Sequence, residues 1–454
     1  MLTEISTAID DRSARGIAAA IGRMITAGTL PVDSRLPTVR ALSKTLRVSP
    51  TTVSEAWQTL AAVGAIEARG RLGTFVRQPV GPGSPQRYRR VTEGPGHFEL
   101  DLSSGTPDPD LLPDLSRVVA LVSRQSLTSS YLDQPVLPEL DRILRDTWPF
   151  AAEDMTVVDG AMDALDRVAQ VIVRLGDRVV VEHPCFPPVI DLLERLGAEV
   201  IGVDVDTEGI SVEGLRAALA LQPTAVFLQP RAQNPTGVTM TARRCAAISR
   251  LLATSTAIVV EDDHSGDIAS GALFSVGSTL PSRTVHIRSF SKSHGPDLRL
   301  AAIGGAGDVV SAVANRRLLG PGWSSRILQA VLVALLQDPA TAKSLRKARQ
   351  EYTRRRRVVT DVLAERGVPF TGTDGINLWM RVDDERSALL TLAAQGIGAA
   401  PGKPFMVRDD DDSLRVTVGL LQGSDHEIAA VAHRLADAAA LSQDRFGVRR
   451  PGQR

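Results

Sequence analysis

The chain has 454 residues, with 52 Lys and Arg against 52 Asp and Glu and 43% hydrophobic residues, which excludes a fibrous or disordered class. Its apolar runs are too short to cross a bilayer, and two cysteines are too few for a disulfide framework. We therefore expect a globular cytoplasmic protein with room for two or three cores, no membrane contact and no metal site. The first 90 residues carry 13 basic against 6 acidic residues, a local positive charge that suits a phosphate backbone.

The N-terminal segment has the pattern of three helices and a hairpin. Apolar residues recur at helical spacing between residues 13 and 27, and Thr38 can cap a second helix. Ser49 and Pro50 suit the cap and first position of a third helix, which has one apolar and one short polar face. Residues 64–76 then alternate and turn like a two-stranded hairpin. This order predicts a winged helix-turn-helix, although a small helical docking or dimerisation domain also fits the pattern.

The sequence of residues 34–76, SRLPTVRALSKTLRVSPTTVSEAWQTLAAVGAIEARGRLGTFV, closely resembles the GntR-type winged helix. The resemblance implies that the third helix enters the major groove of DNA and that the hairpin lies near the backbone. Pro50 stands where many relatives have an arginine, so sequence preference would come from the following polar residues or from DNA shape. The DNA-binding residues that the resemblance implies are Arg35, Arg40, Ser49, Thr51, Thr52, Ser54, Arg71, Gly73 and Thr74.

Residues 79–98, PVGPGSPQRYRRVTEGPGHF, are rich in proline, glycine and arginine, and we interpret them as a flexible linker. The predicted domains are therefore 1–78, a DNA-binding domain, and 99–454, a larger α/β domain.

The larger domain alternates strand-like runs with amphipathic helices, which predicts a mostly parallel sheet. Ligands bind such sheets at the carboxyl ends of the strands. The expected strands are residues 156–159, 178–182, 225–229, 257–262 and 284–289, with helices at 164–175 and 242–253 among them.

Candidate binding residues follow several of these strands. Gly160 leads from a strand into a helix, so the amides of Ala161 and Met162 would face a phosphate. Phe186 follows the next strand and is either a ring that lies against a planar heterocycle or a core residue.

The remaining candidates each supply a different part of a site for pyridoxal 5'-phosphate. Asn234 could donate to a phenolate oxygen, and Asp262 could pair with a protonated pyridine nitrogen. Lys292 supplies an amine that can attack an aldehyde. Hydroxyls and a guanidinium that could hold the phosphate come from Ser289, Ser291 and Arg299.

These motifs appear in the order of the fold type I aminotransferases, which residues 100–440 resemble. The resemblance implies a large parallel-sheet subdomain, a smaller α+β subdomain, a homodimer, and Lys292 in a Schiff base with the cofactor. It also assigns Tyr131 to the phosphate of the neighbouring subunit and Arg415 to a carboxylate of the ligand. His264 stands where most relatives have a tyrosine that touches the 3'-oxygen, and Met162 replaces a commonly polar residue.

A GntR-like winged helix, a linker and an aminotransferase-like domain, in that order, resemble the MocR family of transcription regulators. This resemblance implies a DNA-binding regulator that senses an amino acid, an amine or pyridoxal 5'-phosphate itself. The alternatives are an active aminotransferase with a vestigial DNA-binding domain and a DNA-binding scaffold without cofactor. We expect the four arginines 354–357 to lie on a solvated or dimer-flanking helix face.

Overall fold

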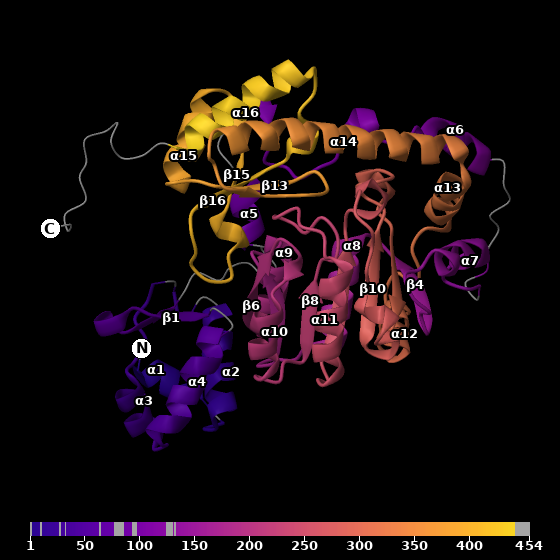
Figure 1. Ribbon diagram of the computed structural model, residues 1–454. Helices are drawn as coiled ribbons and strands as arrows, with labels where there is room; N and C mark the ends of the chain where they lie inside the picture. Colours follow the sequence, from indigo (N-terminus) through magenta and orange to yellow (C-terminus); the bar gives the residue numbers. More distant parts are fainter. Residues whose placement is uncertain are drawn as a thin grey trace. The chain divides into compact units, whose positions relative to one another are not determined.

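The computed structural model describes residues 2–9, 11–26, 29–31, 33–62, 65–76, 86–92, 98–123, 130 and 133–440. It divides into two compact units, Met1–Pro85 and Gln86–Arg454 (Figure 1). No helix among these described residues is long and apolar enough to cross a membrane.

The first unit contains four helices and a two-stranded antiparallel sheet among its described residues. Ile17 and Ile21 of one helix pack with Leu42, Val53 and Trp57 of the next two, so each helix buries its apolar face in one shared core. The predicted helices and hairpin are confirmed. Their bounds are α1 Leu2–Thr7, α2 Ala14–Thr26, α3 Val39–Leu46, α4 Pro50–Ala62, β1 Ile66–Ala68 and β2 Thr74–Val76.

The helix starts in this unit follow from side-chain capping. The Thr38 side chain accepts a hydrogen bond from the Ala41 amide at the start of α3. At the start of α4, Ser49 Oγ accepts from the Thr52 amide at 3.0 Å. A threonine hydroxyl thus caps the start of α3, and a serine hydroxyl caps the start of α4.

The second unit is built on an eight-stranded sheet in the order β4-β11-β10-β9-β8-β5-β6-β7. The pairs from β10 through β9, β8 and β5 to β6 are parallel, and β11 is antiparallel to both of its neighbours. The mostly parallel sheet is therefore confirmed. The strands are β4 Asp154–Val158, β5 Arg178–His183, β6 Glu199–Asp206, β7 Gly209–Ile210, β8 Ala225–Leu228, β9 Ile258–Asp263, β10 Thr284–Ser289 and β11 Ala301–Gly305.

Helices cover both faces of this sheet and bury two separate apolar clusters. They are α8 Ala161–Ile172, α9 Pro187–Arg195, α10 Val212–Leu219, α11 Ala242–Ala253 and α12 Gly307–Arg317. Three more helices, α6 Leu115–Val122, α7 Pro138–Asp146 and α13 Arg326–Gln337, enclose a third cluster beside β4 and β11.

A smaller α+β subdomain completes the second unit. It has an antiparallel sheet in the order β12-β13-β16-β15, and α14 (Pro339–Glu365) runs along the top of the unit from α13 into it (Figure 1). The remaining elements are α15 Glu385–Ala394, α16 Asp425–Ala439, β3 Leu100–Asp101, β12 Phe370–Thr371, β13 Leu378–Arg381, β14 Ile397–Gly398, β15 Ala400–Pro401 and β16 Ser413–Val416.

Two features differ from the sequence-based expectations. Residues Gln86–Thr92, within the expected linker, form the helix α5, which packs on α9. The expectation of a solvated arginine face is wrong for Arg355 and Arg356, which are both 5% exposed. Arg355 Nη1 donates to Asp108 Oδ2 at 2.7 Å, and Arg356 Nη1 donates to the Gly375 carbonyl at 2.6 Å. Two of the four arginines 354–357 are thus buried, and they form hydrogen bonds with residues that are distant in the sequence or in another element.

Candidate functional site

The carboxyl ends of β4, β5, β8, β9 and β10 surround one cavity in the second unit. Parallel strands bring their ends to the same edge of a sheet, so residues far apart in sequence meet there. The cavity is lined by Ala161, Met162, Leu165, Phe186, Gln229, Asn234, Asp262, His264, Ser289, Ser291, Lys292 and Arg299.

One end of the cavity can hold a phosphate. Gly160, with φ +105°, precedes α8, whose first amides point away from the helix. A Cβ at Gly160 would lie 3.2 Å from Arg299 Nη2, so the absence of a side chain lets the guanidinium approach this helix start. Ser289 and Ser291 line the same cavity, and Ser289 Oγ accepts from the Ser291 amide at 3.4 Å. This end combines backbone amides, hydroxyls and a cation.

The middle of the cavity fits a protonated heterocycle. Asp262 Oδ2 accepts from Gln229 Nε2 at 2.7 Å, whereas Asp262 Oδ1 is buried and has no hydrogen-bond partner among the described residues. Burial raises the pKa of Asp262 to about 6. A buried carboxylate oxygen without a partner favours a cationic N–H donor, so these residues fit the pyridine nitrogen of pyridoxal 5'-phosphate.

Lys292 lies beside this carboxylate. Burial, followed by the nearby charge of Arg415, lowers the pKa of Lys292 to about 8, while Asp262 opposes the shift. Roughly a tenth of the amine is then neutral at pH 7, far more than for a solvated lysine. Lys292 Nζ donates to the Gly105 carbonyl at 2.8 Å, which holds the amine in place.

Arg415 is not among the residues that line the cavity, but the loop 103–105 connects it to Lys292. Its Nη2 donates to the Ser103 carbonyl, and its guanidinium lies 5.4 Å from the ring centre of Phe405. A Cβ at Gly105, whose φ is +66°, would collide with Arg415 Nη1, so a side chain at this position would displace the guanidinium. Arg415 is 2% exposed, and its Nε has no hydrogen-bond partner in the described part of the chain. It is therefore a buried cation that can accept an anion from a ligand.

Sequence reasoning missed three residues of this site. Gln229 connects Asp262 to the backbone of Asn234, because its Oε1 accepts from the Asn234 amide at 2.8 Å. Glu182 Oε2 accepts from the Gln229 amide at 3.0 Å, and burial raises the pKa of Glu182 to about 8. Gly105 is the third. The position of Gln229 at the end of a predicted strand could have marked it, but nothing in the sequence marks Gly105.

Three other expected residues need separate mention. Phe186 lines the cavity and also packs against the core of the sheet, so both of its expected roles coexist. His264 lines the cavity, and burial lowers its pKa to about 3, so the imidazole is neutral. Tyr131 lies outside the described residues.

The expected DNA-binding residues lie in the first unit. Arg35, Arg40, Ser49 and Thr51 are exposed, whereas Thr52, Ser54, Gly73 and Thr74 are half-buried. Arg71 falls between the two strands, and its side chain lies outside the described part. Arg35 packs against the hairpin, since a Cβ at Gly73 would lie 2.9 Å from Arg35 Nε. Exposed arginines next to a helix start and a hairpin match the surface that a winged helix offers to DNA.

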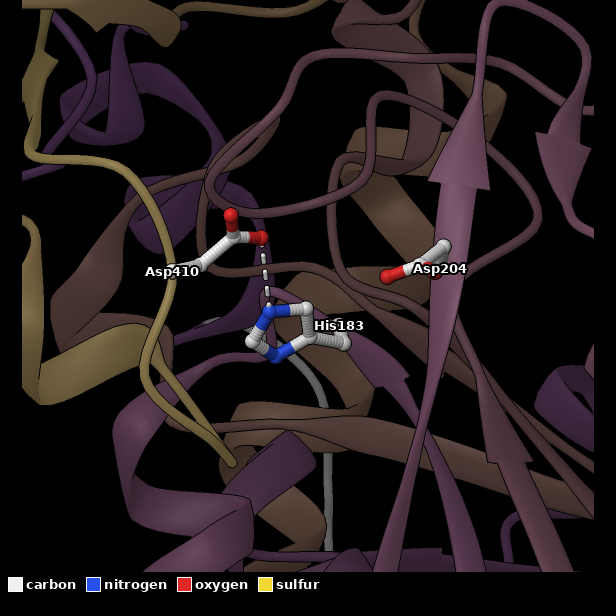
Figure 2. Close-up of side chains that lie close together, drawn as sticks. All are labelled: His183, Asp204 and Asp410. Atoms are coloured by element: carbon white, nitrogen blue, oxygen red, sulfur yellow. Dashed lines mark hydrogen bonds and ion pairs between the residues drawn. The ribbon is translucent and has the colours of Figure 1, made fainter.

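A second group of polar side chains, His183, Asp204 and Asp410, also lies close together (Figure 2). His183 Nδ1 accepts from the Val407 amide at 3.3 Å, so Nε2 carries the proton and donates to Asp410 Oδ2 at 3.2 Å. Asp204 is paired with Arg408. These contacts occupy side-chain atoms that a metal ion would need as ligands. We therefore interpret the three residues as a hydrogen-bonded link between β5 and the loop before β16.

Comparison with known families gives two matches. "Aminotransferase class I and II" matches residues 99–435, and "Bacterial regulatory proteins, gntR family" matches residues 13–76.

Two relatives match the chain over most of its length. The vitamin B6 salvage pathway transcriptional repressor PtsJ of Salmonella typhimurium is 37% identical over 434 residues, which cover 94% of this chain and 99% of the repressor. The HTH-type transcriptional regulator TauR of Rhodobacter capsulatus is 29% identical over 439 residues, which cover 84% of this chain and 88% of that regulator.

Solved structures share the fold. A kynurenine aminotransferase of Pyrococcus horikoshii has a TM-score of 0.70 at 22% identity and covers 79% of this chain and 95% of its own. The α-aminoadipate aminotransferase LysN of Thermus thermophilus has a TM-score of 0.70 at 20% identity and covers 84% of this chain and 98% of its own. These likenesses show the aminotransferase fold.

Proposed function

The chain belongs to the MocR-type subfamily of GntR regulators, and we propose that it controls transcription in response to pyridoxal 5'-phosphate. Residues 1–78 would bind DNA and residues 99–454 would bind the ligand. The observation that carries the proposal is the pocket of the second unit, where the low-pKa amine of Lys292 lies beside Asp262 Oδ1, an oxygen without a hydrogen-bond partner among the described residues. A DNA-binding scaffold without a ligand has no use for this pair.

The residues of the pocket divide the work of holding the ligand. The amides of Ala161 and Met162, with Arg299, would bind its phosphate dianion. Asp262 Oδ1 would accept a hydrogen bond from its ring nitrogen. When bound, the cofactor supplies an aldehyde that a primary amine can attack. Lys292 would present that amine, held by the Gly105 carbonyl and kept partly neutral by burial.

The identity of the ligand is supported by the relative from Salmonella, which is named as a repressor of vitamin B6 salvage. We propose pyridoxal 5'-phosphate, a form of vitamin B6, as the ligand of this chain. We also propose a homodimer, because two copies of a winged helix can read two half-sites of one operator.

A second candidate function, transamination, is favoured by one observation. The chain keeps both Lys292 and the buried cation Arg415, which an enzyme would need to hold an amino acid beside the cofactor. Release of an oxo acid on mixing the loaded protein with amino acids would support this function.

The test measures ligand binding and DNA binding in the same samples. Purified full-length protein is titrated with pyridoxal 5'-phosphate while its visible absorbance is recorded, and DNA is selected from a random duplex library with and without the ligand. We expect a saturable absorbance change and a selected sequence whose affinity depends on the ligand. Saturable binding without any selected sequence would contradict the regulatory function.

A further inference from the structure

Gln229 links three segments of the chain that meet at the cavity. It follows β8 and is 8% exposed. Its backbone amide donates to Glu182 Oε2 on β5 at 3.0 Å, and its Nε2 donates to Asp262 Oδ2 on β9 at 2.7 Å. Its Oε1 accepts from the Asn234 amide at 2.8 Å. One residue therefore connects the strands on both sides of β8 with the loop that follows β8.

These contacts allow the side-chain amide of Gln229 a single orientation. The backbone amide of Asn234 is a donor, so it needs an acceptor and selects Oε1. Nε2 is then the atom that faces Asp262, and it supplies the hydrogen that a carboxylate accepts. The reverse orientation would set oxygen against carboxylate and N–H against N–H, which leaves buried polar groups without partners. The side chain is therefore held as a donor toward Asp262.

This donor makes the two oxygens of Asp262 unequal. Oδ2 accepts from Gln229, whereas Oδ1 is buried and has no hydrogen-bond partner among the described residues. Gln229 lines the cavity together with Asp262. The hydrogen bond from Gln229 thus decides which oxygen of the carboxylate a ligand in the cavity can meet.

The same hydrogen bond favours the ionised form of Asp262. Burial raises the pKa of this carboxyl to about 6, and the bond from Gln229 is the largest influence in the opposite direction, ahead of the charge of Lys292. Burial also raises the pKa of Glu182 to about 8, so that carboxyl is mostly uncharged at neutral pH. The titratable groups around Asp262 are, in chain order, Glu182, Cys185, Asp263, His264, His286 and Lys292. Among the described residues, Gln229 therefore does most to keep Asp262 charged.

We infer that Gln229 is a positioning residue, which donates to one oxygen of Asp262 and so presents the other, as a carboxylate, to a ring whose nitrogen carries a proton. This inference rests on the proposed function, since the ring is that of pyridoxal 5'-phosphate. Through the Asn234 amide, Gln229 also holds the residue expected at the phenolate oxygen of the ring. It therefore sets the spacing between the groups expected at two polar atoms of the ligand.

The experiment measures how binding of pyridoxamine 5'-phosphate depends on pH. This probe has the same ring but no aldehyde for Lys292 to attack. The affinity of the full-length protein is measured by equilibrium dialysis from about pH 5 to about pH 8. In the unaltered protein, affinity should fall as the pH drops through about 6 and Asp262 takes up a proton.

In Gln229→Met the midpoint of this fall should move upward by about one pH unit, because a hydrogen bond to a charged group contributes roughly that much. Methionine has a similar length and no donor, so Asp262 loses the bond that favours its ionised form. The probe titrates in the same way with both proteins, and its own protonation cancels in the comparison. A purely structural role of Gln229 would weaken binding by the same factor at every pH and leave the midpoint in place.

Two further variants complete the test. Gln229→Asn keeps an amide but is one methylene shorter and cannot reach both partners, so its midpoint should also move upward. It answers the question if Gln229→Met does not fold. Gln170→Leu removes another hydrogen bond from an amide to a carboxylate, from Gln170 Nε2 to Asp166 Oδ2 at 2.7 Å on α8, and should keep the profile of the unaltered protein.

The possible results separate the inference from the proposed function. A midpoint that stays in place in the folded Gln229 variants, with or without a uniform loss of affinity, would overturn the inference while the proposed function stands. If the unaltered protein binds pyridoxamine 5'-phosphate at no pH, the proposed function falls and takes the inference with it.

Discussion

The two units of the chain present their candidate binding groups to opposite environments. In the first unit, Arg35 and Arg40 are exposed cations: Arg40 lies on the helix that Thr38 caps, and Arg35 packs against the hairpin. In the second unit, Lys292 and Asp262 are desolvated, and both have shifted pKa values. Exposed charges interact through screened, salt-dependent forces, whereas buried charges respond strongly to pH and to single substitutions. We therefore expect DNA binding to be tuned by salt and ligand binding by protonation.

The largest effect should come from a substitution of Asp262, which tests whether the buried charges of the second unit bind the ligand. Asp262→Asn keeps the shape of the side chain but removes the charge that would pair with the ring nitrogen. We expect the affinity for pyridoxal 5'-phosphate, measured by equilibrium dialysis, to fall by about a hundredfold or more. An affinity within a factor of three of the unaltered protein would show that Asp262 Oδ1 does not face the ligand.

The next largest effect should come from Gly105, where a comparison with a second glycine separates the cost of backbone strain from that of a collision inside the pocket. Gly105→Ala and Gly367→Ala both place a side chain at positive φ, +66° and +68°, but only at Gly105 would the new Cβ meet another group, Arg415. Each should lose about 1–2 kcal/mol of stability from the left-handed backbone. Only Gly105→Ala should also weaken binding of N-(5'-phosphopyridoxyl)-L-alanine, by about tenfold, because Arg415 must move. Equal binding by both variants would contradict the role of Arg415.

The pH dependence sharpens the same comparison. Neutral Lys292 is the reactive form, so attachment of pyridoxal 5'-phosphate should increase as the pH rises through about 8, the pKa of this lysine. The Arg415 charge helps to lower this pKa, so Arg415→Gln should move the midpoint upward by roughly one pH unit. Asp262 acts in the opposite direction, and Asp262→Asn should move the midpoint downward. Stopped-flow absorbance, recorded from about pH 6 to about pH 10, gives the midpoint of the pH profile for each variant and so measures both shifts.

The smallest effects should appear in the first unit. Arg35→Gln and Arg40→Gln should each reduce the dependence of DNA affinity on salt by about one unit of log–log slope, if each neutralises one phosphate. Arg346→Gln, an exposed arginine on α14, is the matched control and should leave the slope unchanged. If all three variants kept the log–log slope of the unaltered protein, the DNA-binding surface would lie elsewhere.

The sequence predicted most elements of both units, because their patterns are local. Helix caps at Thr38 and Ser49 and apolar strand-like runs need only nearby residues to be recognised. The ends of parallel strands then meet by topology, which is why Asn234, Asp262 and Lys292 could be expected at one cavity.

The misses have long-range causes. Arg355 pairs with Asp108, 247 positions away, and α5 docks on Asp191, more than 100 positions away, so neither contact leaves a mark in the local pattern. Proline and glycine on both sides of α5 favoured a linker, and the helix exists because α9 and the segment around Phe405 offer it partners. Tertiary contacts of this kind decide whether a short helix forms.

The most direct test of the whole account compares Lys292→Ala with Lys347→Ala, an exposed lysine on α14. DNA affinity for the selected operator is measured with and without pyridoxal 5'-phosphate, alongside the visible absorbance. We predict that Lys292→Ala loses both the absorbance change and the response of DNA affinity to the ligand while it still binds DNA, and that Lys347→Ala keeps both. A Lys292→Ala protein whose DNA affinity still responds to the ligand like the unaltered protein would contradict the account.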